Sequence, residues 1–206
     1  SAGAFEWAER VTSIAIPAAT VDISSSTFGS MNRVETITVE SGNPVYDSRN
    51  NCNALIETAT NTLIAGSTYT SIPDTVTAIG AEAFTFRSYI TAIDLPTSLV
   101  SIGNSAFQGC TSLTSIVIPA SVTSIGTNAF VSCSNLGSVI FGNTFGWSVK
   151  ASGSSSSTSI NGTNLSNKST AATYLTSTYT SYAWTCGVLD ESEYSNLIFT
   201  PISGTT

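Results

Sequence analysis

The strongest constraint on this chain is a repeat of 23 residues that runs from Pro73 to Gly142. Its units begin at Pro73, Pro96 and Pro119, and each of these prolines is counted as position 1 of its unit. Apolar residues recur at positions 4, 7, 12, 18, 21 and 23, and glycine recurs at position 8. A fixed period of this length, with apolar residues at fixed offsets, is typical of a solenoid whose stacked coils bury a continuous core.

Every unit predicts the same local structure. Positions 18–23, such as Leu113–Ile118, favour a strand that buries positions 18, 21 and 23, and the next proline ends it because proline has no N–H to donate. Positions 4–7, such as Val122–Ile125, predict a second short strand. We expect Gly126 to permit a tight bend, and Ala129 and Phe130 to begin a short helical or 3-10 turn.

Equivalent residues of stacked coils are expected to form columns, because neighbouring coils lie about 4.8 Å apart. The column at position 12 contains Phe84, Phe107 and Phe130. Cys110 and Cys133 share position 15, where the spacing permits a disulfide but parallel side chains favour two reduced thiols in an apolar column. Arg87 replaces cysteine at that position, which favours a packing site over a chemical one.

The period divides the chain into a solenoid over residues 1–142 and a C-terminal capping segment and tail over residues 143–206. The solenoid contains a half repeat (4–16), a degraded repeat with Ser24 in place of glycine (17–39), a modified coil (40–72) and regular repeats (73–142). Either the array begins with a half-turn cap, or the sequence is cut from a longer array. We favour the second, because Phe5 requires a neighbouring coil to cover it.

Two segments depart from the period. In the modified coil, short apolar runs on both sides of Thr58–Asn61 predict a hairpin that replaces the helical turn. Residues 151–170 are rich in Ser, Thr, Asn and Gly and predict a loop. Ser169–Leu175 predicts a short helix capped by Ser166 or Asn167, and Asn196–Pro201 has the pattern of a strand. The aromatic residues expected to cover the open end of the solenoid are Tyr174, Tyr179, Tyr182 and Trp184.

Composition argues against several classes of function. The chain has no histidine, which excludes Ser-His-Asp and Cys-His catalysis and any His-ligated metal. Its six Lys and Arg residues are scattered and its net charge is −7, which argues against nucleic-acid binding. The chain has no run of 18 apolar residues, so no transmembrane segment is predicted. Four cysteines without a Cys-x-x-Cys pair predict neither a disulfide scaffold nor a zinc site.

The acidic residues also favour solvation over chemistry. A glycosidase needs two carboxylates across a cleft, and only Glu35 and Glu40 near Asp94 approach such an arrangement. The acidic run 190–193 favours a solvated tail over a weak calcium contact. We attribute the three N-glycosylation sequons to chance in a polar loop. These sequons begin at Asn161, Asn164 and Asn167. We therefore predict no catalytic residue, no cofactor and no metal.

A binding surface is predicted on the outward positions 20 and 22 of the long strands. Val117 and Ile140 are apolar neighbours there, which a partner could cover; the alternative is that the C-terminal segment or a neighbouring molecule covers them. The candidate binding residues are Thr38, Asp94, Ser115, Val117, Ser138 and Ile140.

The repeat resembles the BspA-like leucine-rich repeats. That family's unit, IPxSVTSIGxxAFxxCxxLxSIxIP, is nearly literal in residues 118–126 and 128–133. Residues 42–53 with 57–63 resemble a variant unit, and 169–179 with Trp184 resemble the closing segment of such arrays. The resemblance spans residues 4–184 and fails at Ser24, at Arg87 and after Trp184.

The resemblance implies a secreted or cell-surface protein of host-associated bacteria, linked to adhesion, with no catalytic motif. We therefore expect a β-rich (α/β) solenoid that acts as a non-enzymatic interaction module. Its expected partner is a host matrix protein, another cell or a glycan. The alternative is a structural spacer that presents another domain away from the cell surface, and an enzyme such as a glycan hydrolase is disfavoured.

Overall fold

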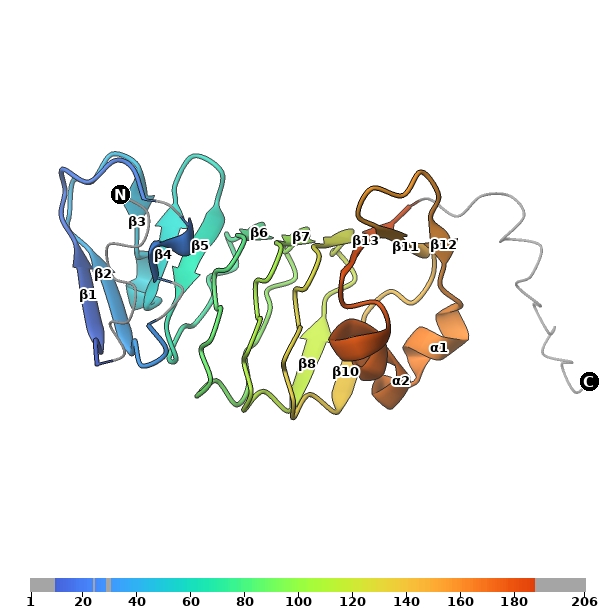
Figure 1. The fold of residues 1–206 in the computed structure, drawn as a ribbon. Helices are drawn as coiled ribbons and strands as arrows, with labels where there is room; N and C mark the ends of the chain where they lie inside the picture. Colours follow the sequence, from blue (N-terminus) through green and yellow to red (C-terminus); the bar gives the residue numbers. More distant parts are fainter. Residues whose placement is uncertain (1–9, 24, 29–30, 188–206) are drawn as a thin grey trace, which may run out of the picture.

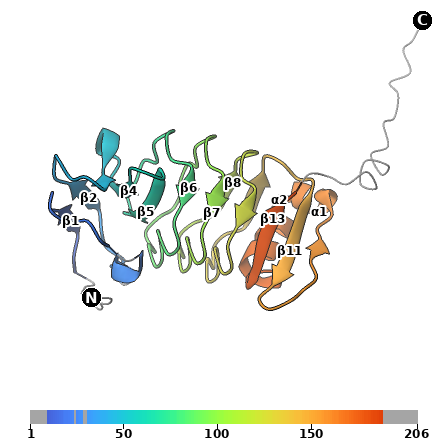
Figure 2. The same ribbon diagram turned by 90° about the horizontal axis from the view of Figure 1, so that it is seen from above.

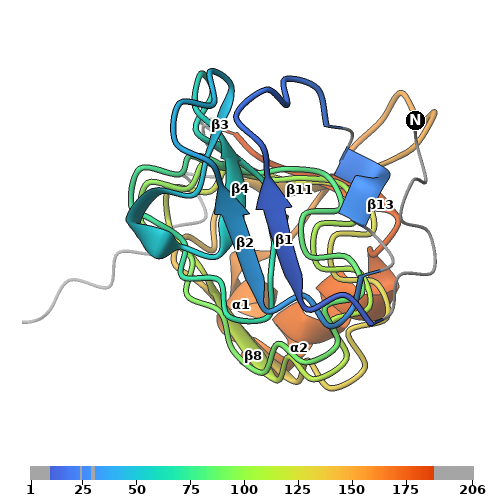
Figure 3. The same ribbon diagram turned by 90° about the vertical axis from the view of Figure 1, so that its left-hand side faces the viewer.

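A computed structural model describes residues 10–23, 25–28 and 31–187, and it is an elongated stack of coils (Figure 1). Viewed along the long axis, the regular coils lie one behind another (Figure 3). The predicted β-rich solenoid is confirmed. Its described strands form one large sheet and two separate parallel pairs.

The elements follow the chain in three parts. The N-terminal part contains β1 (Ser13–Ile16), the 3-10 turn η1 (Ser25–Phe28), β2 (Thr36–Val39), β3 (Tyr46–Asp47), the short turn η2 (Arg49–Asn51), β4 (Ala54–Glu57) and β5 (Thr62–Gly66). The regular coils contain β6 (Ala78–Ile79), β7 (Ser101–Ile102), β8 (Ser115–Ile118), β9 (Ser124–Ile125) and β10 (Ser138–Phe141). The C-terminal part contains β11 (Trp147–Ala151), β12 (Thr158–Ser159), α1 (Gly162–Ser166), α2 (Lys168–Thr173), the π turn η3 (Tyr174–Thr178) and β13 (Tyr182–Cys186). The large sheet has nine strands in the order β12-β11-β13-β9-β7-β6-β5-β4-β3, and the two parallel pairs are β1-β2 and β8-β10.

The phenylalanine column of the regular coils is present. The rings of Phe84 and Phe107 are stacked with centroids 5.0 Å apart, and those of Phe107 and Phe130 with centroids 5.2 Å apart. All three side chains are fully buried. One ring per coil therefore forms the centre of the core, as the repeat predicts.

The glycines at position 8 serve a different purpose from the one predicted. Gly103 and Gly126 do not adopt a positive φ, so no left-handed bend requires them. A Cβ on Gly103 would lie 2.6 Å from the backbone nitrogen of Ala81, and one on Gly126 would lie 2.5 Å from that of Asn104. A tight turn does follow each of these glycines, as predicted, but the conformational freedom of glycine is not what it needs. Glycine is needed here because the backbone of the preceding coil approaches too closely for any side chain.

The helical turn predicted at position 12 is also absent from the regular coils, where successive tight turns replace it. Residues with positive φ interrupt any helical run at positions 10 and 14 of each unit, because a left-handed residue cannot continue a right-handed helix. They are Glu82, Ser105 and Asn128 at position 10, and Phe86, Gly109 and Ser132 at position 14. The degraded repeat does have a 3-10 turn at the equivalent place, η1.

The predicted hairpin is confirmed, since β4 pairs antiparallel with β5. However, it does more than replace a turn. Leu55 and Ala65 belong to an N-terminal core with β2, whereas Ile56 and Leu63 belong to the core of the regular coils. The hairpin is therefore a wall between two cores, which is why consecutive β4 residues are fully buried on both faces.

Position 15 links each regular coil to the one before it. The Cys110 thiol donates to the carbonyl oxygen of Phe84 at 3.2 Å, and the Cys133 thiol donates to that of Phe107 at 3.0 Å. Both cysteines are free, so the reduced column is found rather than the disulfide. Burial raises the pKa of Cys133 to about 12 and also raises that of Cys110, which keeps both thiols protonated.

Arg87 performs the same task over a longer distance. Its guanidinium is buried and donates to the carbonyl oxygens of Gly66, Thr85 and Phe28 at 2.8, 3.1 and 3.1 Å. Phe28 occupies position 12 two coils earlier. Arg87 reaches that far because the modified coil has no residue equivalent to Phe28. Burial lowers the pKa of Arg87 to about 10. The interpretation of Arg87 as a packing residue agrees with these contacts.

Strands and helices together close the C-terminal end. β13 pairs antiparallel with β9 and with β11, so the sheet continues past the last coil (Figure 2). Trp184 lies against Phe141 and Tyr179, which confirms the predicted aromatic cover, and Trp147 joins this cluster. The helices α1 and α2 contact β10.

The polar segment 151–170 is not a continuous loop, which corrects that prediction. It contains β12 and α1, and α2 begins within it. Asn161 caps α1 by accepting from the backbone N–H of Thr163, and Asn167 caps α2 by accepting from Ser169 and Thr170. The predicted short helix with its Asn167 cap is confirmed. Phe5, the acidic run 190–193 and the strand predicted at Asn196–Pro201 lie outside the described residues.

Candidate functional site

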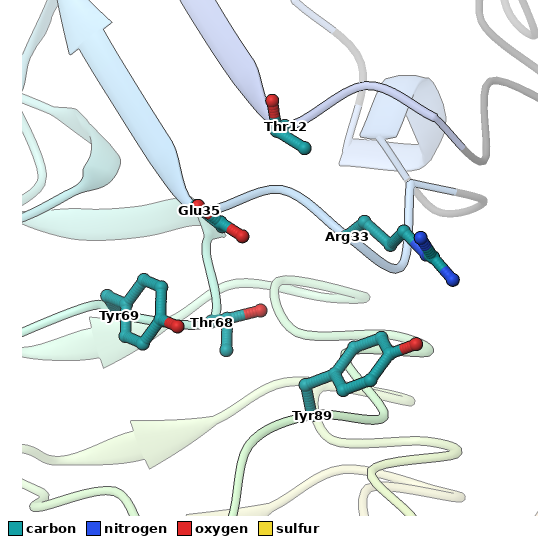
Figure 4. Close-up of a pocket in the computed structure, with 6 residues that line it drawn as sticks. All are labelled: Thr12, Arg33, Glu35, Thr68, Tyr69 and Tyr89. Carbon is teal, nitrogen blue, oxygen red and sulfur yellow. The ribbon is translucent and has the colours of Figure 1, made fainter.

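A pocket of about 420 Å³ lies where the N-terminal part meets the regular coils (Figure 4). Its walls come from both sides of the hairpin wall, so it exists only because the two parts are packed together. The lining residues are Thr12, Arg33, Glu35, Thr68, Tyr69 and Tyr89.

Backbone hydrogen bonds tie three of these residues into a row. The carbonyl oxygen of Thr12 accepts from the backbone N–H of Glu35 at 2.8 Å, and the carbonyl oxygen of Val34 accepts from that of Thr68 at 2.8 Å. Thr12 precedes β1 and Glu35 precedes β2, while Thr68 follows β5. The floor of the pocket is therefore held by the coil-to-coil bonds that build the solenoid.

A local network positions Tyr69. The Ser67 hydroxyl is fully buried and accepts from the backbone N–H of Tyr69 at 3.2 Å. The Thr70 hydroxyl donates to the carbonyl oxygen of Asn53 at 2.8 Å, and the Asn53 amide donates to the carbonyl oxygen of Tyr69 at 3.4 Å. These bonds hold the turn while the Tyr69 side chain remains 63% exposed.

The opposite wall pairs a cation with an aromatic ring. The guanidinium carbon of Arg33 lies 6.0 Å from the centre of the Tyr89 ring. This distance is at the outer edge of a cation–π contact, which is worth about 0.5–1 kcal/mol at an exposed site. In Figure 4 the Arg33 guanidinium lies at the Tyr89 end of the pocket, and Glu35, Thr68 and Tyr69 lie at the other end.

A second, smaller hollow of about 280 Å³ lies further along the same coils. It forms where the positions that make long strands in later coils, Ser67–Ile72 and Ile90–Leu95, contain no strand. Its lining residues are Thr70, Ser71, Ile72, Ala92, Ile93 and Asp94.

The structure brings together only some of the predicted binding residues. Ser138 pairs with Ser115, and Ile140 pairs with Val117, in the parallel register of β8 and β10. Val117 and Ile140 are both exposed, so no described residue buries them. Asp94 lies one coil away in the second hollow, and Thr38 lies in the separate β1-β2 sheet. The predicted residues therefore do not form one continuous stripe.

The carboxylates considered for hydrolysis lie at separate places. Glu35 lines the larger pocket, Asp94 lines the smaller one, and Glu40 accepts from the backbone N–H of Ala18 at 2.9 Å. Within residues 10–23, 25–28 and 31–187, no three His, Cys, Asp or Glu side chains gather as metal ligands would. In the same residues, no helix has the length and apolar character to cross a membrane.

Sequence reasoning missed the larger pocket. Tyr69 stands four residues before Pro73, as Ala92 stands four before Pro96, and so occupies the outward position 20. Counting backwards from Pro73 would have found it. The extra residues of the modified coil hide the period there, and the meeting of Arg33 with Tyr89 depends on tertiary packing.

The BspA type leucine rich repeat region matches this chain in six copies, over residues 1–62 and 64–180. The chain belongs to the BspA-type leucine-rich repeat family. The match includes the modified coil and the segment after residue 142, which carry only traces of the period. No functionally curated protein matches the chain.

Solved structures of bacterial proteins share the fold. A leucine-rich repeat protein from Eubacterium ventriosum is 27% identical, with a TM-score of 0.57, over 63% of this chain and 36% of its own. The pneumococcal vaccine antigen PcpA is 20% identical, with a TM-score of 0.50, over 66% of this chain and 40% of its own, which is a likeness of fold alone. The chain therefore spans well under half the length of these proteins.

Proposed function

We propose that this BspA-type array is a non-enzymatic recognition module of a secreted or cell-surface protein, which binds a host or microbial surface protein or a glycan. The observation that supports it best is the pocket between the two cores. There the chain exposes two tyrosine rings and two opposite charges, whereas the phenylalanines of the position 12 column are fully buried. Exposed aromatic and charged side chains on a rigid scaffold are typical of binding surfaces.

The interior supports a role in binding rather than in catalysis. The described cysteines at position 15 are buried, their thiols donate to backbone carbonyl oxygens, and their raised pKa values leave little thiolate. The carboxylates lie apart from one another, as described above. The exposed pair Val117 and Ile140 adds a second place where an apolar partner surface could dock.

The test is a screen of the isolated chain against extracellular-matrix proteins and a glycan array. We expect at least one specific binder. Val117→Lys combined with Ile140→Lys should weaken binding to a protein partner by at least about tenfold, because it places two charges in an apolar contact. Val100→Lys, an exposed valine outside this pair, is the matched control. Unchanged binding by the double variant removes β8 and β10 from the binding surface.

One observation favours the spacer as the second candidate. The nine-stranded sheet runs from β3 to β12 through both cores, which makes the array rigid along its length. A spacer needs only that rigidity. Exchange of this array for an unrelated solenoid of equal length within the full protein distinguishes the two functions. Adhesion should survive the exchange if the array is a spacer and disappear if it is the recognition module.

A further inference from the structure

The larger pocket exposes two tyrosine rings, unlike the phenylalanine column of the regular coils. Tyr69 is 63% exposed and Tyr89 is 51% exposed, whereas Phe84, Phe107 and Phe130 are fully buried. The exposure of Tyr69 is enforced, since Ser67, Thr70 and Asn53 hold its backbone in a turn that directs the ring outward. A ring held open in this way offers a flat apolar face to a ligand without losing much conformational entropy on binding.

The charges of the pocket select against a ligand with a single charge. Arg33 and Glu35 line the same space, and among the described residues the one ion pair is that of Arg49 with Asp47. An anion would be attracted by Arg33 and repelled by Glu35, and a cation would meet the reverse. A neutral ligand with many hydroxyl groups can donate to the carboxylate and accept from the guanidinium at once.

Size and rigidity complete the argument. A volume of about 420 Å³ lies at the lower end of the range for small-molecule sites, about 300–1,000 Å³, which fits a short ligand or the end of a longer one. The hydroxyls of Thr12 and Thr68 add further donors and acceptors along a floor that backbone bonds tie together. The site is therefore largely formed before any ligand arrives.

We propose that this pocket binds the end of a neutral saccharide, with a pyranose ring stacked on Tyr69 and its hydroxyls bonded to Glu35, Arg33 and the threonines. A pyranose is the ligand chemistry that combines an apolar C–H face with vicinal hydroxyls and no net charge. This inference rests on the proposed recognition function and names the ligand class of one of its surfaces.

The experiment uses the whole chain and saturation-transfer NMR with lactose, maltose and N,N′-diacetylchitobiose, followed by titration of any sugar that responds. The charged comparators are 3′-sialyllactose and choline. We expect at least one neutral disaccharide to bind and both comparators to bind more weakly than it does. Tyr69→Ala should weaken binding at least about tenfold, Tyr69→Trp should retain it within about threefold, and Glu35→Gln should weaken it by about three- to tenfold.

Phe145→Ala is the matched control, because Phe145 is an exposed aromatic residue, 49% accessible, that does not line the pocket. No response from the three neutral sugars, tighter binding of a charged comparator, or equal binding by Tyr69→Ala and wild type would overturn the saccharide site. If the chain still binds a matrix protein, the recognition function survives that result. If it binds nothing in either assay, both proposals fail.

Discussion

The regular coils over residues 73–142 and the junction around the modified coil use the same repeat positions for different purposes. In the regular coils each position meets its own equivalent, so ring stacks on ring, glycine lies against backbone, and each thiol reaches the carbonyl one coil before it. At the junction these partners are missing. Arg87 donates to Phe28, two coils back. The backbone of Gly66 covers the ring of Phe84, the first of the column, and a Cβ on Gly66 would lie 1.9 Å from that ring.

The difference teaches where specificity can arise in such an array. In the regular coils, strict repetition packs each inward residue against its equivalent in the next coil. An interruption leaves positions without equivalents, and these must be filled by residues unlike the consensus. The larger pocket and the exposed tyrosines that line it lie at this interruption.

The largest effect is expected for Phe107→Ala, which tests the packing of the regular coils. Because Phe107 is stacked on both sides, we expect the free energy of unfolding to fall by about 3–5 kcal/mol through cavity formation. Urea titration followed by circular dichroism measures it. Phe107→Leu, which keeps most of the volume, should lose much less, and a loss below about 1 kcal/mol for the alanine variant would contradict the column.

The junction is tested by Arg87→Cys, which restores the consensus residue. Cysteine is too short to reach Phe28, so buried carbonyl oxygens lose their donors and stability should fall by about 2–3 kcal/mol. Hydrogen exchange should quicken most in residues 31–66, on the far side of the hairpin wall. The exposed Arg33→Cys is the matched control, with an expected change within about 0.5 kcal/mol. Equal stability of Arg87→Cys and wild type would show that the long reach is dispensable.

The close approach of coils is tested by a pair of glycines. Gly103→Ala places a Cβ 2.6 Å from backbone atoms of Gly80 and Ala81, and we expect it to lower stability by about 1–3 kcal/mol. The nearest atom to a Cβ on Gly137 is 4.0 Å away, so Gly137→Ala should be nearly neutral. Thermal unfolding of both variants checks the difference. If the two losses are equal, spacing between coils is not the reason for glycine at position 8.

The smallest effect concerns the pH dependence of the regular coils. Burial raises the pKa of Cys133 to about 12 from an ordinary 9.0, so above that ordinary value the unfolded chain loses the proton while the folded chain keeps it. The stability from this thiol is complete below pH 9.0 and is lost as pH rises through about 12. Between about pH 8.5 and about pH 10 the loss should be about 1 kcal/mol, measured by urea titration. Cys133→Ala should show a correspondingly shallower decline, and an identical slope would contradict a neutral buried thiol.

The sequence predicted most of what is periodic. The phenylalanine column, the short strand before Gly126, the inward residues of Leu113–Ile118 and the hairpin around Thr58–Asn61 follow from spacing and turn chemistry alone. The purpose of the glycines escaped it, because a close approach between backbones leaves no trace in a single unit. The polar segment 151–170 was misjudged, since its helices are stabilised by asparagine caps and by contact with β10 rather than by apolar periodicity.

By itself the sequence determined that like residues would lie above like, because a constant 23-residue interval with constant apolar offsets allows no other arrangement of the regular coils. Only the tertiary structure decided that the hairpin divides two cores and that Arg33 and Glu35 meet Tyr69 and Tyr89 around one pocket. The physical reason is that residues without an equivalent in the next coil take their neighbours from packing across the interruption, and no interval along the chain encodes that contact.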